Sequence, residues 1–280
     1  MKLVRYGASG AEKPGMMDGD TLRDLSGVID DITGDTLTDE ALARLQSIDP
    51  STLPAVEGSP RLGACVGNIG KFLCIGLNYS DHAAEQGLPI PEHPILFFKA
   101  NSAVVGPNDD VIMPRGSKRS DWEVELGVVI GKTAKYVSEA DALDYVAGYC
   151  VINDVSEREF QQNLTGQWTK GKSCDTYGPT GPYLVTRDEI PDPQALDMSL
   201  SVNGNQMQTG NTATMIFSVA QIIEHLSQLF TLHPGDVIST GTPPGVGDGM
   251  NPKTYLKVGD VMELEIEGLG KQRQEVGQDA

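Results

Sequence analysis

The sequence predicts a mainly β protein of the α+β class, and three observations support this prediction. Short apolar runs bounded by Gly, Pro, Asn and Asp recur along the chain, as in strands joined by turns. Helical periodicity is confined to a few short segments, and strands and helices do not alternate regularly, which argues against a Rossmann fold or a TIM barrel. The length of 280 residues allows one large or two small domains.

The first part of the chain, residues 1–65, predicts a small N-terminal α+β domain. Residues 1–25 alternate short apolar pieces with Gly and Asp, which predicts a meander of short strands. Residues 38–46 predict a short helix, because Thr38 precedes acidic residues in the first turn. Residues 50–60 contain three prolines, two serines and a glycine, which is typical of a linker. We therefore place a domain boundary near residue 65.

The second part, residues 66–280, predicts a catalytic domain built mainly of strands. Its clearest helix spans Ser218–Phe230, where apolar residues recur at helical spacing. Two more helices are predicted at Ser80–Gln86 and Ser138–Tyr145. The predicted strands are the runs KFLCIGLN, HPILFFKA, DVIMP, EVELGVVIG, YVAGYCVIND, PYLVT, LDMSLSVNGN, DVISTGTP and DVMELEIEG.

Composition excludes two classes of partner. The chain carries 21 Lys and Arg against 39 Asp and Glu, a formal charge of −18, so we expect no binding to nucleic acid or to an anionic membrane surface. No apolar run approaches the ~18–20 residues of a membrane span, and we expect no leader peptide at the N-terminus. The four cysteines have no disulfide or zinc-site spacing and predict reduced thiols. We therefore expect a cytoplasmic protein.

Two glycine-containing segments resemble phosphate-binding loops and are interpreted otherwise. Gly166–Ser173 matches the pattern GxxxxGK[ST], but that motif requires a buried strand before it and a helix after it. Polar residues precede the segment, and two glycines and two prolines follow it, so we do not expect a nucleotide site. In Gly241–Gly249 the paired prolines remove backbone donors, which predicts a rigid loop.

A candidate cation site begins in the run DWEVELG. In a strand, Glu123 and Glu125 point to one face and Val124 to the other. Two carboxylates on one face indicate either a solvated edge strand or a bound cation. Asp154 ends the next apolar run and favours the cation, because three carboxylates without Cys or His form the oxygen-only ligand set that Mg²⁺ or Mn²⁺ selects.

A candidate general base lies in the segment NYSDHAAE. On a helix, His82 and Glu85 are i, i+3 neighbours, and the carboxylate would raise the basicity of the imidazole and set its tautomer. The alternative is a surface contact, which such a pair more often makes. The preceding strand KFLCIGLN places the pair at the end of a strand and favours a functional role.

From about Lys71 to Gln272 the chain resembles the fumarylacetoacetate hydrolase family. The matching segments, in order, are CIGLNYSDHAAE, ILFFKANSAVVG, DWEVELGVVIG, GYCVINDVSEREFQ, KGKSCDTYGPTGP and GDVISTGTPPGVG. The resemblance implies a mixed β-sandwich roll, a homodimer, and one Mg²⁺ or Mn²⁺ per subunit. It implies that the metal ligands are Glu123, Glu125 and Asp154.

The resemblance also implies roles for other residues. His82 and Glu85 correspond to a pair that activates water, and Lys172 to an active-site lysine. Gln161 and Thr242 correspond to positions near the substrate. The polar residues that we consider as contacts to a hydroxylated substrate tail are Lys99, Ser102, Arg115, Lys118, Arg119 and Gln161. For the lysines and arginines the alternative, which is more common, is an ordinary surface position.

The implied reaction is hydrolysis of the C–C bond of a 2,4-diketo acid, giving pyruvate and a second acid such as lactate. The chain looks most like hydrolases of 2,4-diketo-3-deoxy-L-rhamnonate or -fuconate, and such sequences are often named ureidoglycolate lyase. An oxaloacetate-type decarboxylase or an acylpyruvate hydrolase on the same metal site is the alternative. A non-catalytic metal-binding β-roll is the alternative from another class, and it would consume no keto acid.

Overall fold

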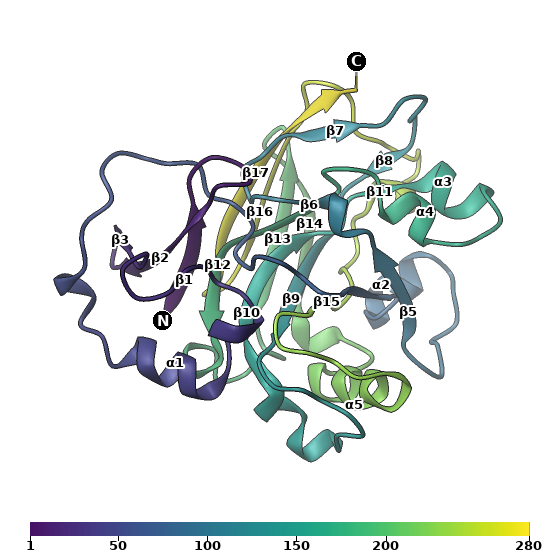
Figure 1. Cartoon of the computed structure of the whole chain (residues 1–280). Coiled ribbons are helices and arrows are strands. Elements are labelled where there is room, and N and C mark those ends of the chain that lie inside the picture. Colours follow the sequence, from purple (N-terminus) through teal and green to yellow (C-terminus); the bar gives the residue numbers. More distant parts are fainter. Residues whose placement is uncertain (280) are drawn as a thin grey trace.

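The computed structural model describes residues 1–279, which form two main sheets (Figure 1). The larger sheet has ten strands and runs along one path with a short strand added at its side. Its order is β3 (Thr21–Asp24), β2 (Lys13–Asp18), β1 (Lys2–Tyr6), β12 (Gly178–Thr186), β10 (Val146–Asn153), β9 (Val124–Ile130), β15 (Val237–Ser239), β4 (Phe72–Gly76) and β5 (Ile95–Lys99), with β6 (Val104–Val105) paired to β12.

The second sheet has five strands, and two short strands pair separately. The five-stranded order is β14 (Asn205–Asn211), β13 (Asp197–Val202), β16 (Val261–Ile266), β17 (Gly270–Gln278) and β7 (Val111–Met113). The separate pair is β11 (Ser156–Glu157) with β8 (Ser120–Asp121). The prediction of a mainly β protein is therefore confirmed.

Five α-helices lie around these sheets in the described residues. They are α1 (Asp39–Gln46), α2 (Ser80–Glu85), α3 (Arg158–Asn163), α4 (Thr169–Lys172) and α5 (Val219–Leu229). Short 3-10 turns span Gly34–Thr36, Pro50–Thr52, Asn101–Ala103, Glu139–Tyr145, Arg187–Glu189, Thr212–Thr214 and Gly247–Gly249. None of the helices in residues 1–279 has the length and apolar character needed to cross a membrane.

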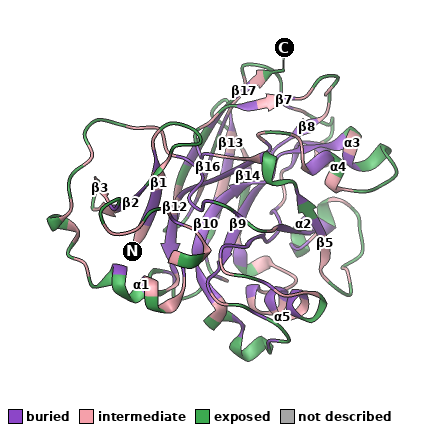
Figure 2. Cartoon of the chain, in the orientation of Figure 1, coloured by how far each residue is buried: buried purple, intermediate pink, exposed green. Residues whose placement is uncertain are grey.

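Strand β9 passes through the middle of the molecule, and its two faces contact different cores. Val124, Leu126 and Val128 pack with residues of β13 and β16 in the core between the sheets. Val129 faces the other way and packs in a second core. The central strands are buried along their whole length (Figure 2). Side-chain alternation on β9 therefore points Glu123 and Glu125 away from the core between the sheets.

The N-terminal segment continues the large sheet. Strand β1 pairs antiparallel with β12, with Leu3 opposite Leu184. Leu3 and Met16 share the second core with Cys150 of β10. The strand meander predicted for residues 1–25 is present as β1 to β3. The domain boundary near residue 65 stays a prediction.

All four predicted helical segments are helical, three as α-helices and one as a 3-10 helix. Thr38 caps α1 by accepting a hydrogen bond from the Ala41 backbone N–H, and Ser218 caps α5. Residues 80–85 form α2. The helix predicted at residues 138–145 is present as a 3-10 helix over Glu139–Tyr145. Ala142 is its one buried side chain, so little apolar burial supports regular α-helix there.

Two helices and two strands were not predicted from the sequence. Helices α3 and α4 are short and mostly polar, and strands β14 and β17 carry many Asn, Gln and charged residues. Their pairing with β13 and β16 comes from tertiary structure. Local sequence contains little signal for such segments.

Candidate active site

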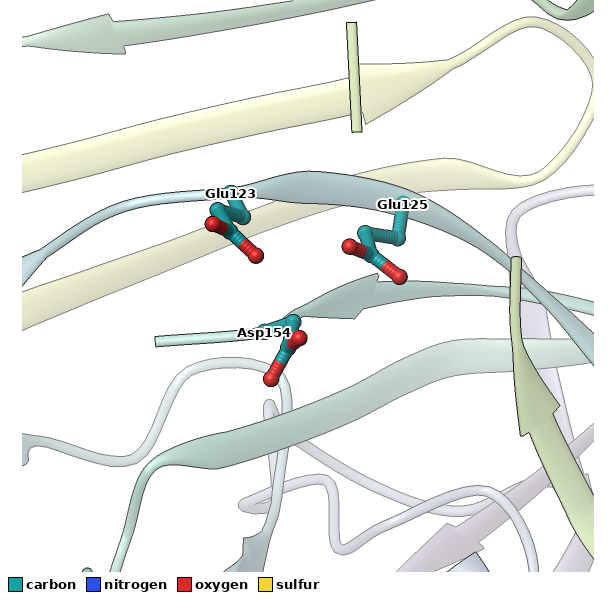
Figure 3. Close-up of side chains that lie close together, drawn as sticks. All are labelled: Glu123, Glu125 and Asp154. Atoms are coloured by element: carbon teal, nitrogen blue, oxygen red, sulfur yellow. The ribbon is translucent and has the colours of Figure 1, made fainter. Parts of the chain in front are cut away.

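Three buried carboxylates meet where β9 and β10 lie side by side. Glu123 and Glu125 project from the same side of the β9 segment, and Asp154 follows the last residue of β10 (Figure 3). The pairing of β9 with β10 places Glu125 opposite Ile152 and Val124 opposite Asn153. One oxygen of each carboxylate lies within 4.8 Å of the others. We call Glu123, Glu125 and Asp154 the carboxylate triad.

Three cations surround two members of the triad. Lys172 Nζ lies 2.5 Å from Glu123 Oε2 and 2.7 Å from Asp154 Oδ2. Arg158 Nη2 lies 2.6 Å from Glu123 Oε1, and Lys99 Nζ lies 2.6 Å from Asp154 Oδ1. Burial opposes ionisation of Glu123, but Lys172 and Arg158 outweigh it and lower the pKa of the carboxyl. Burial likewise opposes the charge on Lys172, but Asp154 and Glu123 raise the pKa of its amine above the usual value.

Glu125 has a different environment. Its Oε2 accepts hydrogen bonds from Ser239 Oγ at 2.5 Å and from the Gly241 backbone N–H at 2.9 Å. Within residues 1–279 this side chain forms hydrogen bonds and no ion pair. Burial, followed by the negative charges of Asp154 and Glu123, raises the pKa of Glu125 well above its usual value.

The triad fits a hard divalent cation. All three ligand side chains are carboxylates, which are the oxygen donors that Mg²⁺ and Mn²⁺ prefer. Asp154 Oδ1 is fully buried, and it accepts no hydrogen bond of normal geometry despite its contact with Lys99. Together with Glu125, this oxygen gives the site two buried acceptors whose charge a cation would stabilise.

His82 and Glu85 form the predicted pair on α2. His82 Nδ1 lies 2.9 Å from Glu85 Oε2, and the imidazole is 7% exposed. Because an ionised carboxylate can only accept, Nδ1 carries the proton, and in the neutral imidazole the lone pair is then on Nε2. The Gly245 backbone N–H donates to Glu85 Oε1 at 2.9 Å and holds the carboxylate in place. The arrangement leaves Nε2 as a base.

A cavity of about 100 Å³ brings most of these groups together. The predicted site residues that line it are His82, Glu123, Glu125, Gln161, Lys172 and Thr242. Asp154 lies behind this lining as part of the triad, and Glu85 lies behind His82. Thr242 Oγ1 donates to the Val124 carbonyl and accepts from Gln208, so its one donor is used within the protein.

The remaining predicted residues lie outside the cavity lining. Lys99 is buried and donates to the backbone carbonyls of Val155 and Lys172, so it supports the site from behind. Ser102 is exposed on a 3-10 turn. Arg119 pairs with Glu159 and Asp248. Lys118 and Arg115 lie on the surface, and Arg115 pairs with Asp279.

The Gly241–Gly249 loop holds several carboxylates of the site by its backbone. The N–H groups of Gly241 and Gly245 donate to Glu125 and Glu85, as described above. Gly245 has a φ of +104°, and a Cβ there would lie 2.0 Å from the Met207 carbonyl oxygen. Glycine is therefore required at this point of the loop.

The sequence analysis missed two charged residues of the site. Arg158 lines the cavity and bridges Glu123 to Asp121, which is fully buried. Arg158 follows Asp154 by four residues, and Asp121 precedes Glu123 by two. The only local indication that Arg158 and Asp121 belong to the site is that each lies within four residues of a predicted metal ligand. Their ion pairing depends on how α3 folds back on β8, which no local pattern reveals.

The GxxxxGK[ST] match has no phosphate-loop structure. Helix α3 precedes it, and β12 is the first regular element after it. Trp168, inside the match, lines the cavity and packs against Phe97 with ring centroids 5.5 Å apart. A Cβ on Gly76 would lie 2.1 Å from the indole, so glycine at this position allows the ring to approach.

Comparison with known proteins agrees with this fold and site. Residues 71–277 match the sequence profile of the family described as fumarylacetoacetate (FAA) hydrolase C-terminal. A Burkholderia lata protein whose name classes it as a hydrolase is 61% identical over 276 residues, covering 98% of each chain. The fold and the carboxylate triad define an enzyme of the hydrolase and isomerase type. The chain belongs to the fumarylacetoacetate hydrolase family.

Solved structures of the family superpose on the whole chain. A fumarylacetoacetate hydrolase from Exiguobacterium antarcticum matches with a TM-score of 0.89 and 34% identity, covering 100% of both chains. A maleylpyruvate hydrolase from Sphingobium sp. SYK-6, solved with manganese(II) and pyruvate, matches with a TM-score of 0.84 and 28% identity over 100% of both chains. A 2-hydroxyhepta-2,4-diene-1,7-dioate isomerase from Mycobacterium marinum matches with a TM-score of 0.75 and 32% identity, covering 100% of this chain and 99% of the other.

Proposed function

We propose that this protein is a hydrolase that uses Mg²⁺ or Mn²⁺ to cleave the C–C bond of a 2,4-diketo acid, giving pyruvate and a second acid. The observation that carries the proposal is one small cavity lined by two carboxylates of the triad, a carboxylate-oriented histidine and a buried lysine, with the third carboxylate directly behind the lining. The neighbour solved with manganese(II) and pyruvate supports both the metal and the product.

Glu123, Glu125 and Asp154 would hold the metal. A divalent cation bound there supplies electrophilic stabilisation of the negative charge that the reaction develops on oxygen. Lys172 adds to this stabilisation because it keeps its proton, and its ammonium lies against two of the carboxylates.

His82 is the general base in this proposal. With its proton fixed on Nδ1 by Glu85, His82 Nε2 can remove a proton from a water molecule in the cavity. The resulting hydroxide attacks the distal keto carbon of the substrate. The C3–C4 bond then breaks, the bonding electrons pass to the pyruvate enolate, and protonation at C3 gives pyruvate and the second acid.

We extend the proposal to substrates with a hydroxylated tail, such as 2,4-diketo-3-deoxy-L-rhamnonate or -fuconate. Gln86 and Asp248 line the cavity and offer amide and carboxylate groups for hydroxyls. Gln161 accepts a hydrogen bond from Arg158 through Oε1, which leaves its amide N–H groups for a substrate oxygen. Lys99 and Ser102, which the sequence suggests as substrate contacts, do not line the cavity, and Lys99 instead donates to the Val155 and Lys172 backbone carbonyls.

The decisive experiment is a panel of acids assayed for pyruvate release with Mg²⁺. The panel contains a 2,4-diketo-3-deoxy sugar acid, simple acylpyruvates and oxaloacetate, each tested with the wild type and with His82→Ala. We expect turnover of diketo acids and a loss of at least 100-fold in kcat for His82→Ala. Turnover of oxaloacetate alone, with His82→Ala fully active, would replace the hydrolase with a decarboxylase.

We also propose that the enzyme is a cytoplasmic homodimer. All four cysteines are free thiols, as expected in a reducing compartment. Strand β5 is an edge of the large sheet, and its exposed Phe98 lies beside Phe230 and near the end of α5, where Leu229 is 56% exposed. Light scattering would test the dimer, and a monomeric mass across micromolar concentrations would exclude it.

A further inference from the structure

Asp121 is a buried carboxylate of the site that no step of the proposed reaction uses. Its Oδ1 accepts hydrogen bonds from the backbone N–H groups of Trp122 at 2.9 Å and Gly247 at 2.7 Å. Its Oδ2 accepts from the Asp248 backbone N–H at 2.9 Å and from Arg158 Nε at 2.8 Å. Four donors on a fully buried carboxylate fix its orientation.

Arg158 connects Asp121 to the triad. Its Nη2 lies 2.8 Å from Asp121 Oδ2 and 2.6 Å from Glu123 Oε1. Its Nη1 donates to Gln161 Oε1 at 3.0 Å. The planar guanidinium therefore spans two carboxylates with little freedom to move. This contact holds Glu123 Oε1, while Glu123 Oε2 contacts the Lys172 ammonium.

The Gly241–Gly249 loop reaches Asp121 from the opposite side. A Cβ at Gly247 would lie 2.9 Å from Asp121 Oδ1 and 1.8 Å from the Thr254 carbonyl oxygen. Only a glycine lets the backbone approach the carboxylate this closely. Asp121 thus joins β8, α3 and the loop at one point.

We propose that Asp121 is a positioning residue for the cation site, which acts by holding Arg158 and so fixes the place and the charge of Glu123. The inference rests on the proposed metal dependence. The site contains four carboxylates and three cations, so its formal charge is −1. The carboxylates are Asp121, Glu123, Glu125 and Asp154, and the cations are Lys99, Lys172 and Arg158. Without Asp121 this charge becomes zero, and Arg158 is left to pair with Glu123 alone, in competition with the metal.

The test measures Mn²⁺ binding to the metal-stripped full chain by isothermal titration calorimetry. We expect Asp121→Asn to raise the Kd for Mn²⁺ at least tenfold. In an Arg158→Gln background the same substitution should raise it less than threefold, because no guanidinium remains to be redirected. A purely structural role for Asp121 predicts an equal effect in both backgrounds.

Asp236 provides the matched control. It is 1% exposed, accepts hydrogen bonds from the backbone N–H groups of Lys71 and His233, and pairs with the Lys71 ammonium. It does not line the cavity. Asp236→Asn should lower the melting temperature and leave the Kd for Mn²⁺ unchanged.

Arg158→Lys tests the proposal independently of whether Asp121→Asn folds. It keeps the charge and removes the planar fork, so we expect at least a fivefold rise in the Kd for Mn²⁺. Wild-type affinity in Asp121→Asn or in Arg158→Lys overturns the positioning role alone. Failure of the wild type to bind Mn²⁺ overturns the metal dependence, and the positioning role with it.

Discussion

Glu125 differs from the other two carboxylates of the triad because its described contacts are hydrogen bonds from Ser239 and the Gly241 backbone. Its neighbours Glu123 and Asp154 each contact lysine or arginine. In the metal-free protein, burial and these negative charges favour the protonated form of Glu125. A bound cation would reverse this preference, so metal binding and protonation would compete at Glu125.

We predict that Glu125→Gln abolishes metal binding without destabilising the metal-free protein. The amide oxygen can still accept the two hydrogen bonds, but the ligand charge is lost. We expect the Kd for Mn²⁺ to rise by about 100-fold or more. Calorimetry and urea unfolding of the metal-free proteins would check both parts. Tight Mn²⁺ binding by the variant would contradict the ligand assignment.

The difference in the free energy of unfolding between metal-free Glu125→Gln and wild type should depend on pH in one direction. A carboxyl whose pKa is raised on folding contributes stability at low pH and loses it as pH rises through the folded pKa. The usual value for Glu125 is 4.5, and the folded value is well above it. The free energy of unfolding of Glu125→Gln relative to wild type should therefore increase as pH rises above about 4.5, and then level off. A difference independent of pH would contradict the raised pKa.

Lys172 combines two effects that a substitution can separate. Its ammonium stabilises Glu123 and Asp154 in the metal-free protein, and it occupies acceptors that a metal would use. We predict that Lys172→Met binds Mn²⁺ at least as tightly as wild type, while kcat falls by about 100-fold to 1000-fold. Parallel titration and kinetics would check this. Loss of Mn²⁺ affinity in step with kcat would show that the lysine supports the metal site instead.

At the scale of elements, the Gly241–Gly249 loop connects the triad to the base. It donates backbone N–H groups to Glu125, to Glu85 and to Asp121. His82 and Glu85 lie on α2, whereas the carboxylate triad comes from β9, the residue before β9 and the residue after β10. The loop therefore fixes their relative position, which explains why its glycines approach other groups so closely.

We predict that Gly245→Ala lowers kcat by about tenfold or more and affects Mn²⁺ affinity little. The new Cβ would clash with the Met207 carbonyl and displace the N–H that holds Glu85. Gly259→Ala is the control, because Gly259 also has a positive φ of +88° but has open space around its Cβ. Both variants should lose about 1–2 kcal/mol of stability from backbone strain. Equal kcat values in the two variants would contradict the role of the loop.

At the scale of the whole molecule, the formal charge of −18 belongs mainly to the surface. The site itself has a formal charge of only −1, because three cations offset four carboxylates. The field of the molecule opposes an anionic substrate, but charges beyond ~8–10 Å are screened at physiological salt. The charges within the site, and not the net charge of the molecule, therefore govern the binding of a cation or an anionic substrate there.

We predict that removing divalent metal with a chelator lowers the melting temperature, and that Mg²⁺ or Mn²⁺ restores it. A ligand at 100 times its Kd stabilises the folded state by about 2.7 kcal/mol. Differential scanning calorimetry of the stripped and reloaded protein would check this. Glu125→Gln should show no shift, and an equal shift in that variant would indicate binding elsewhere.

Much of this fold was predictable from local patterns. The capped helices at Thr38 and Ser218 and the apolar central strands carry their signal in adjacent residues. The polar strands β14 and β17 do not, since their pairing with β13 and β16 determines them. The triad followed from strand alternation and from the end of an apolar run, but its surrounding cations did not.

The sequence by itself determined the residue types of the chemistry: an oxygen-only ligand set, a histidine three residues before a glutamate, and a lysine in a false nucleotide motif. Only the tertiary structure decided which charges face each other. In the folded chain Lys99 pairs with Asp154, and the pair of Asp121 and Arg158 is part of the site. The physical reason is that alternation and capping act between neighbours in the chain. Ion pairs in a buried site form between residues that only the packing of β8, β9, β10 and α3 brings within reach.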